Sequence, residues 1–418
     1  MQFSPLETHE LENGLKVAVA PSPSPGVAVN LWYEVGSVDE HPSKTGFAHL
    51  FEHLMFQGSA NVEPGEHMAL IEAVGGTVNA TTSNDRTNYY ETVPRSALEL
   101  ALWLEADRLE SLSITPENFE AQRQVVKEEK RQRYDNVPYG DLLELLTSQH
   151  FSPEHPYGHL TIGSMEHLDA ATLGDVSEFF ETWYRASNAT LVLVGPLGHD
   201  EGFSLAERYF GHLPKLPSRT PVAESPVPLL EPHTLTVRRP VPYPIVYLSW
   251  PTVPAHHPQQ IAIEIALAIL ADGNASRMHK ALVKEARIAQ ETHTYSMPNR
   301  SAPSLAVIGA RPAAGFTAED TSKAIVDVLQ KFIEEGPMEA EFERAVAQYE
   351  RAWLWQLAAA EDRADVINES WLIHGDPRRS DTHLQDVLAL TSGDIREAAA
   401  RWLTPSETHQ LHYLSEEA

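Results

Sequence analysis

The order of apolar and polar residues predicts a chain in which strands and helices are mixed. Apolar runs at residues 15–20 (LKVAVA) and 27–35 (VAVNLWYEV) predict strands, separated by turn-forming Pro and Ser residues. Residues 65–74 predict a helix that ends at a Gly-Gly pair, and residues 77–93 predict two short strands. The same criteria predict helices at 95–110, 116–133, about 171–185 and 258–271, and strands at 189–194 and 245–250.

This mixture predicts an α+β fold. A length of 418 residues corresponds to about two domains of ~200 residues. The proline-rich segment 214–232 lacks helical periodicity and is the best linker candidate, which gives domains at 1–213 and 233–418. The strand and helix after it repeat the pattern of residues 29–56 at an offset of about 216, a faint sign of internal duplication.

The most informative segment is His49-Leu50-Phe51-Glu52-His53, which has the form H-x-x-E-H. On a helix, His49 and His53 lie about 40° apart, and Glu52 lies about 60° to the other side of His49. Two neutral imidazoles suit Zn²⁺, and a neighbouring carboxylate can take a proton from water at the metal. The order of residues matches the inverzincin pattern.

A solvated surface helix with chance histidines is the alternative. The opposite arc of the helix is apolar, so the helix has a core to pack on. Gly46 and Phe56 fall in the stripe of the histidines, where they predict a groove that something approaches closely. The apolar arc consists of Phe47, Leu50, Phe51, Leu54 and Met55.

The predicted helix at 116–133 offers a third ligand. Thr115 is its predicted N-cap, and Glu129 falls on its packed face with Phe119, Gln122 and Val126, whereas Glu128 points to solvent. A carboxylate on a packed face needs a partner. Zinc is one such partner, and an ion pair with Arg133 or Arg86 is the other.

Three segments resemble the pitrilysin/insulysin family, which includes mitochondrial processing peptidase. They are 46–59 (GFAHLFEHLMFQGS), 75–94 (GGTVNATTSNDRTNYYETVP) and 125–140 (VVKEEKRQRYDNVPYG), and the resemblance is strong over roughly residues 8–200. It implies that His49, His53 and Glu129, which lies 76 positions after His53, bind one Zn²⁺. It implies that Glu52 is the general base. It also implies two similar domains, each an antiparallel-rich mixed sheet covered by helices, that form half of a clamshell chamber.

The resemblance assigns further roles. Asn79 and Ala80 match an edge strand to which a peptide substrate adds as an extra strand. From the residues alone, Asn79 is equally a turn residue after the Gly-Gly pair. Gln122 stands where many members have an acid, so it can hydrogen-bond near the metal site but carries no charge.

The family's Arg and Tyr that stabilise the oxyanion have no clear counterpart here. Gln290 occupies the expected Tyr position. We therefore expect a homologous partner subunit to supply the pair, in a heterodimer. The alternative is a homodimer with local donors such as Arg277, Arg287 or Tyr295.

Composition narrows the partners and the location. The formal net charge of −28 opposes binding to nucleic acid. The chain has no cysteine, so disulfides do not identify its compartment. Neither a signal-peptide pattern nor a membrane-spanning apolar run is present, which predicts a cytoplasmic protein, or a periplasmic one if a signal was removed.

Together these patterns predict a zinc metalloendopeptidase that hydrolyses short or unfolded peptides inside a closed chamber. The alternative is a non-catalytic subunit of such a complex, which binds peptides or serves assembly.

Overall fold

The computed structural model describes residues 5–217 and 227–416 and divides into two compact units. The first unit consists of Met1–Lys130, His159–Val222 and Leu354–Asp381, and the second of Arg131–Gly158, Ala223–Trp353 and Thr382–Ala418. Each unit therefore contains a segment from the other half of the sequence, which a single cut at the proline-rich segment does not produce. Residues 218–226 of the predicted linker lie outside the described residues.

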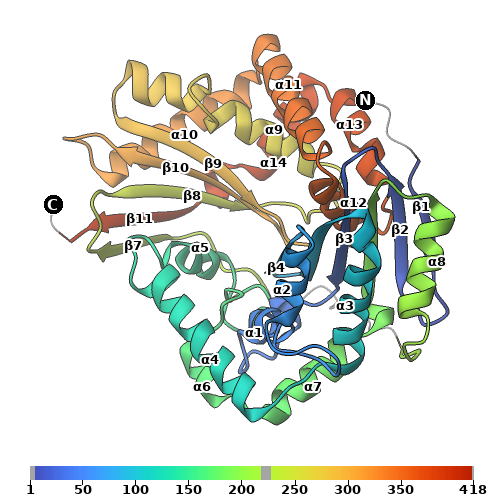
Figure 1. Cartoon of the computed structure of the whole chain (residues 1–418). Coiled ribbons are helices and arrows are strands. Elements are labelled where there is room, and N and C mark those ends of the chain that lie inside the picture. Colours follow the sequence, from blue (N-terminus) through green and yellow to red (C-terminus); the bar gives the residue numbers. More distant parts are fainter. Residues whose placement is uncertain (1–4, 218–226, 417–418) are drawn as a thin grey trace. The chain divides into compact units, whose positions relative to one another are not determined.

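The first unit is built on a six-stranded sheet in the order β1-β2-β6-β3-β5-β4 (Figure 1). Neighbouring strands are antiparallel except β2 and β6, which are parallel. In this order β4 lies at an edge. The bounds are β1 (Glu7–Glu10), β2 (Lys16–Pro21), β3 (Gly26–Tyr33), β4 (Thr77–Thr82), β5 (Thr87–Pro94) and β6 (Ala189–Gly195).

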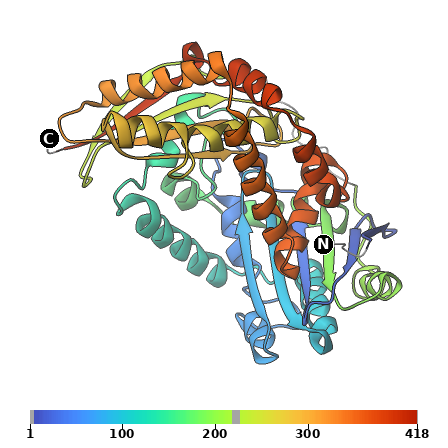
Figure 2. The same ribbon diagram turned by 90° about the horizontal axis from the view of Figure 1, so that it is seen from above.

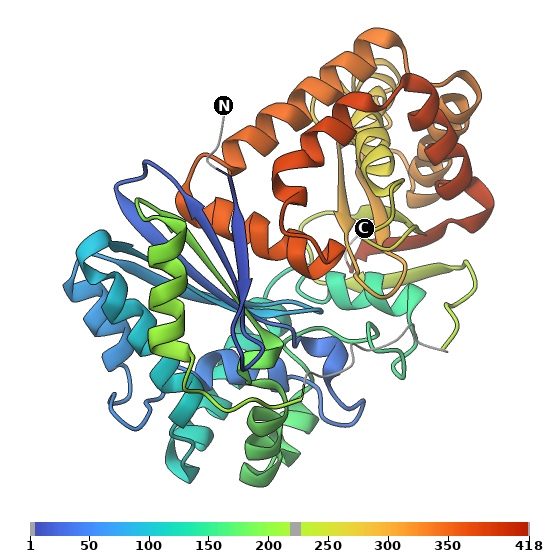
Figure 3. The same ribbon diagram turned by 90° about the vertical axis from the view of Figure 1, so that its right-hand side faces the viewer.

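Helices cover both faces of this sheet. Successive side chains of a strand point to opposite sides, so β2 contacts helices on both faces. Ala18 and Ala20 of β2 pack against α12 (Ala360–His374), a helix from late in the sequence. Val19, between them, faces α8 (His199–Phe210) on the other side, where α3 (Leu98–Ser111) also packs. Figure 3 shows α8 and α12 on either side of the blue strands.

The second unit has a five-stranded sheet in the order β7-β11-β8-β10-β9. One face packs against α9, α10 and α14, and the other against α5. The helices of the first face run along the yellow and orange strands in Figure 2. The bounds are β7 (Thr234–Arg239), β8 (Ile245–Pro251), β9 (Ala289–Met297), β10 (Leu305–Pro312), β11 (His409–Ser415), α5 (Leu142–His150), α9 (Gln260–Ala271), α10 (Ala318–Glu335) and α14 (Ser392–Trp402).

The two sheets have the same topology once β1 is set aside. Replacing β2, β6, β3, β5 and β4 by β7, β11, β8, β10 and β9 converts one strand order into the other. The parallel pair β2–β6 corresponds to the parallel pair β7–β11. The first α-helix after the second strand of each copy is α1 (Phe47–Leu54) in the first and α9 in the second. The predicted α+β fold with two similar sheet-and-helix domains is confirmed, and this topology supports the faint duplication.

The predicted elements agree with the structure apart from their ends. The helix predicted over 116–133 is α4 (Pro116–Lys130), and it continues as a π-helical turn, Arg131–Asp135. None of the helices within the described residues combines the length and apolar character needed to cross a membrane. The other helices are α2 (Glu66–Ala73), α6 (Met165–Ala170), α7 (Leu173–Trp183), α11 (Glu339–Gln356) and α13 (Arg379–Ala389).

Candidate metal centre

Helix α1 separates an apolar face from a polar one. Its apolar residues are buried, whereas the polar residues His49, Glu52 and His53 are only partly buried. The helix therefore lies on a core and leaves one stripe accessible, as its sequence predicts. The buried residues are Phe47, Ala48, Leu50, Phe51 and Leu54.

The start of α1 is fixed by Gly46 and Glu40. Gly46 has φ = 96°, and a Cβ there would lie 2.9 Å from the Ile162 carbonyl oxygen, so this position requires glycine. The Glu40 carboxylate accepts hydrogen bonds from the backbone N–H groups of Gly46 (2.9 Å) and Ala48 (2.7 Å). A negative charge at a helix N-terminus is stabilising. Gly46 thus accommodates a loop of the chain itself, which corrects its assignment to a groove.

The contact with Glu40 also gives a structural role to His159, one of the histidines outside the H-x-x-E-H motif. His159 Nε2 lies 3.0 Å from Glu40 Oε2, so it holds the carboxylate that caps α1. Burial raises the pKa of Glu40, and the contact with His159 opposes that rise. Sequence reasoning missed Glu40. Its only local signal is an acid six residues before Gly46, the N-cap of α1.

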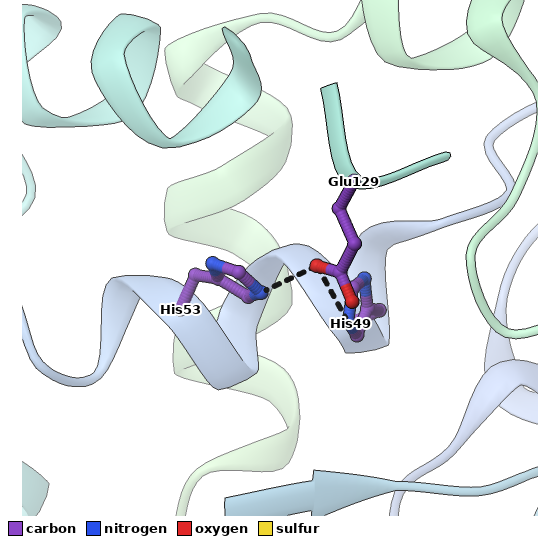
Figure 4. A group of neighbouring side chains, drawn as sticks. All are labelled: His49, His53 and Glu129. Carbon is purple, nitrogen blue, oxygen red and sulfur yellow. Dashed lines mark ion pairs between the residues drawn. The ribbon is translucent and has the colours of Figure 1, made fainter. Parts of the chain in front are cut away.

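Helix α4 brings Glu129 to the histidines. Its N-cap is reciprocal, since Thr115 Oγ1 accepts from the Asn118 N–H (3.2 Å) and Asn118 Oδ1 accepts from the Thr115 N–H (2.9 Å). Glu128 is exposed and Glu129 is partly buried, as the helix-face argument predicts. Glu129 Oε2 lies 3.3 Å from His53 Nε2 and 3.7 Å from His49 Nε2. Figure 4 shows both rings on α1 turned toward the Glu129 carboxylate.

This donor set fits a zinc ion. One ligand atom from each of the three residues lies within 4.8 Å of the other two. Metal–ligand bonds of about 2.0–2.2 Å in tetrahedral geometry place neighbouring ligand atoms about 3.3 Å apart, close to the two observed distances. Two imidazoles and one carboxylate also leave a fourth position for water, as catalytic zinc sites do.

Glu52 lies on the same helix and is held from the edge strand. Thr82 Oγ1 donates a hydrogen bond of 2.6 Å to Glu52 Oε2. Burial raises the pKa of Glu52, while the Thr82 hydrogen bond and the nearby His53 oppose the rise. A carboxyl group with a raised pKa is suited to accepting and returning a proton.

The remaining predicted site residues lie on β4 and α4. Asn79 is exposed and Ala80 is buried on β4, which among the described strands is paired on one side only, with β5. The Asn79 Oδ1 accepts from the Ala80 N–H at 2.9 Å, so a peptide that adds at this edge has to displace that bond. Gln122 is partly buried on α4, two turns before Glu129 on the same face. The roles of Asn79 and Ala80 in substrate binding, and of Gln122 as a hydrogen-bonding residue near the metal site, stay predictions.

A second cluster of titratable groups lies buried beside α1. Phe56, which follows α1, is buried and packs edge-on against His67 of this cluster. The prediction that Phe56 lines a groove is therefore wrong. His67 Nε2 and Glu91 Oε1 are 2.5 Å apart, and the Arg108 guanidinium forms an ion pair with Glu105. Burial raises the pKa of Glu91 to about 7 and lowers the pKa of His67 to about 3. One proton shared by Glu91 and His67, beside a compensated ion pair, leaves the cluster with no net charge and no need for a metal ion.

Glu91→Gln is expected to change how stability depends on pH. Unfolded Glu91 ionises above pH ~4.5, whereas the folded protein keeps its proton up to about pH 7. Wild type therefore loses stability at this residue as pH rises through that window. Glutamine stays neutral at every pH. The free energy of unfolding of the variant, relative to that of wild type, should therefore rise by about 3 kcal/mol from pH 5 to pH 8.

Urea denaturation at pH 5 and pH 8 measures this difference. Burial is the largest cause of the low pKa of His67 and acts on both proteins, so most of its contribution cancels in the comparison. Glu72→Gln, on the exposed side of α2, is the control with the same change in charge. A constant difference between Glu91→Gln and wild type across this range would contradict the assignment of a proton to Glu91.

The candidate oxyanion donors in the second unit have other surroundings. The Arg277 guanidinium pairs with Glu341 (Nη2–Oε2, 2.7 Å) and also donates to the Gly336 carbonyl oxygen (2.7 Å). Tyr295 is on β9 with a buried hydroxyl group, and Gln290 is exposed on the same strand. Arg277 is thus committed to a structural ion pair.

Comparison with protein families gives two matches along the chain. Residues 16–161 match the family described as insulinase (peptidase family M16), and residues 170–349 match the peptidase M16 inactive domain. The first match contains the H-x-x-E-H helix and Glu129.

Individual relatives agree with these matches. The zinc protease PqqE of Helicobacter pylori is 29% identical over 415 residues, which cover 96% of this chain and 91% of that protein. The mitochondrial-processing peptidase subunit beta of Saccharomyces cerevisiae is 29% identical over 236 residues, 56% of this chain and 48% of that protein. The solved structure of a protease from Helicobacter pylori has a TM-score of 0.89 at 26% identity and covers 99% of this chain and 100% of that one.

Proposed function

We propose that this chain, which belongs to the insulinase family of peptidases (M16), is a zinc metalloendopeptidase that hydrolyses short or unfolded peptides inside a closed chamber. The observation that carries the proposal is the convergence of two imidazoles on α1 and one carboxylate on α4, with Glu52 beside them. A retired site has no physical need to keep a base next to a complete set of ligands.

His49, His53 and Glu129 would hold the ion. When bound, Zn²⁺ supplies an activated water molecule and polarises the scissile carbonyl group. Glu52 takes a proton from the attacking water at its carboxylate and later delivers that proton to the nitrogen of the leaving amine. The raised pKa of Glu52 favours the first step, because it makes the carboxylate a stronger base.

The edge of β4 would hold the substrate. A peptide in extended conformation can add to it as a further strand, through main-chain hydrogen bonds near Asn79 and Ala80. Such binding reads the shape of the backbone more than the side chains. It therefore selects extended, unfolded segments, which is the substrate class proposed here.

We further propose that the working enzyme is a dimer with a homologous subunit. Support comes from the similarity to a protein named as a subunit, mitochondrial-processing peptidase subunit beta, and from the ion pair that occupies Arg277. The alternative is that this chain is a non-catalytic subunit. The match of residues 170–349 to a domain described as inactive favours that alternative.

Cleavage of a quenched fluorescent peptide tests the proposal. We expect zinc-loaded protein, assembled with its partner, to cleave the peptide, a chelator to abolish cleavage and added zinc to restore it. The isolated chain should show little activity. Zinc-dependent turnover by a strictly monomeric chain would contradict the dimer. Zinc binding without turnover by the chain alone, as a homodimer, or with any homologous partner would establish the non-catalytic rival.

A further inference from the structure

We propose that Thr82 is a positioning residue: it orients the general base, Glu52, relative to the bound peptide. This inference rests on the proposed function. Thr82 is the last residue of β4, the strand to which the peptide would add. Its hydroxyl group donates to Glu52 across 2.6 Å. The strand that receives the substrate thus also carries the donor that orients the base.

The hydrogen bond gives the two carboxylate oxygens of Glu52 different roles. Thr82 engages Oε2 of Glu52, and none of the hydrogen bonds described for this chain ends on Oε1. Because the Thr82 proton stays on its hydroxyl group, Oε1 is the oxygen that takes the proton from water and passes it to the amine. A fixed Oε2 holds Oε1 in one direction, which is the kind of alignment on which proton transfer depends.

The end of β4 is rigid enough to serve as a reference. The guanidinium group of Arg86, stacked 4.8 Å from the Trp32 ring, donates to the Thr81 carbonyl oxygen (2.9 Å). Asn88 Oδ1 accepts from the Thr81 N–H at 3.1 Å, and its amide nitrogen donates to Asp365 (3.0 Å). The backbone next to Thr82 is therefore fixed from the sheet and from α12.

These contacts link the alignment of the peptide on β4 to the orientation of Glu52, and the reaction requires both. A peptide aligned on β4 has its scissile bond at a fixed distance along that strand, and Thr82 fixes Glu52 relative to the same strand. Without the hydroxyl group, Glu52 can rotate about its side-chain torsions while the peptide still binds. The loss should therefore appear in turnover and not in binding.

Steady-state kinetics of Thr82→Val and Thr82→Ser test this inference. Valine has the shape of threonine without the donor, whereas serine keeps the donor. We expect Thr82→Val to lower kcat by about 10- to 100-fold with KM and zinc content within about twofold of wild type. Thr82→Ser should stay within about threefold of wild type. Unchanged kcat in Thr82→Val would overturn the inference, and so would an equal loss in Thr82→Ser.

Thr92→Val is the matched control. Thr92 Oγ1 also donates to a carboxylate, that of Glu361 on α12, at 2.8 Å, but neither residue belongs to the proposed site. We expect this variant to keep wild-type kcat. If Thr92→Val loses as much turnover as Thr82→Val, the effect comes from general weakening of the sheet and the inference fails.

A second measurement does not depend on turnover. In a Glu52→Gln background, Thr82→Val should leave the Kd of a fluorescent peptide, measured by anisotropy, within about twofold, because Thr82 acts on the base and not on docking. A tenfold weaker Kd would assign Thr82 to peptide binding instead. The two hypotheses fail separately: a zinc-loaded wild type that is inactive even when assembled with its partner defeats the proposed function, whereas an active assembled wild type with an equally active Thr82→Val defeats only this inference.

Discussion

Glu52→Gln is expected to lower kcat by about 10²- to 10⁴-fold while the protein keeps its zinc. Glutamine has the size of glutamate, and its amide oxygen can still accept the hydrogen bond from Thr82. It has no basic oxygen for the proton of the attacking water, so the barrier to attack rises although substrate and metal still bind. Single-turnover kinetics on a quenched peptide, together with elemental analysis of the same preparation, measure both quantities.

Glu72→Gln controls for the loss of one negative charge from a strongly acidic protein. Its side chain is exposed on α2, and wild-type turnover is expected. Near-normal turnover in Glu52→Gln would remove this residue from the role of general base. Loss of zinc from that variant would instead make Glu52 a contributor to the metal site, contrary to the present assignment.

Glu129→Gln is expected to weaken zinc binding by at least about 100-fold, since loss of a hydrogen-bonding partner behind a ligand alone costs 10- to 100-fold. The variant keeps an oxygen near both imidazoles but loses the negative charge that offsets the charge of the ion. Competition with a chromophoric chelator measures the affinity. Activity should fall with the metal content and recover in part with excess zinc.

Glu128→Gln is the control for this change. It alters the neighbouring residue on the same helix, at a position that is exposed. Wild-type zinc affinity is expected there. An unchanged affinity in Glu129→Gln would remove this residue from the ligand set and leave the ion pair as its role.

Local pattern predicts the helices of the site because their periodicity is a property of neighbouring residues. The stripe of His49 and His53 is visible within one turn, and Glu129 is selected both by its helix face and by its distance along the chain. The edge position of β4, in contrast, came from the family resemblance. Nothing in residues 77–82 alone distinguishes an edge strand from an internal one.

Contacts between distant segments were the part that sequence could not supply. Glu40 caps α1 through a turn, and Thr82 reaches Glu52 from a strand thirty positions later. The insertion of β6 between β2 and β3 and the docking of α12 on the first sheet depend on pairing across more than 150 residues. Such pairing is set by the global chain path and leaves no periodic signal in either segment.

The repeated topology limits what the second copy can become. Nine of the twelve residues of α9 are buried, and α14 packs over it, whereas α1 keeps an open stripe. Placing imidazoles or a carboxylate at the buried positions of α9 would leave polar groups in apolar surroundings, at a cost of several kcal/mol for each one left unsatisfied. The packing of α9 thus disfavours a second reaction centre at the equivalent place in the same chain.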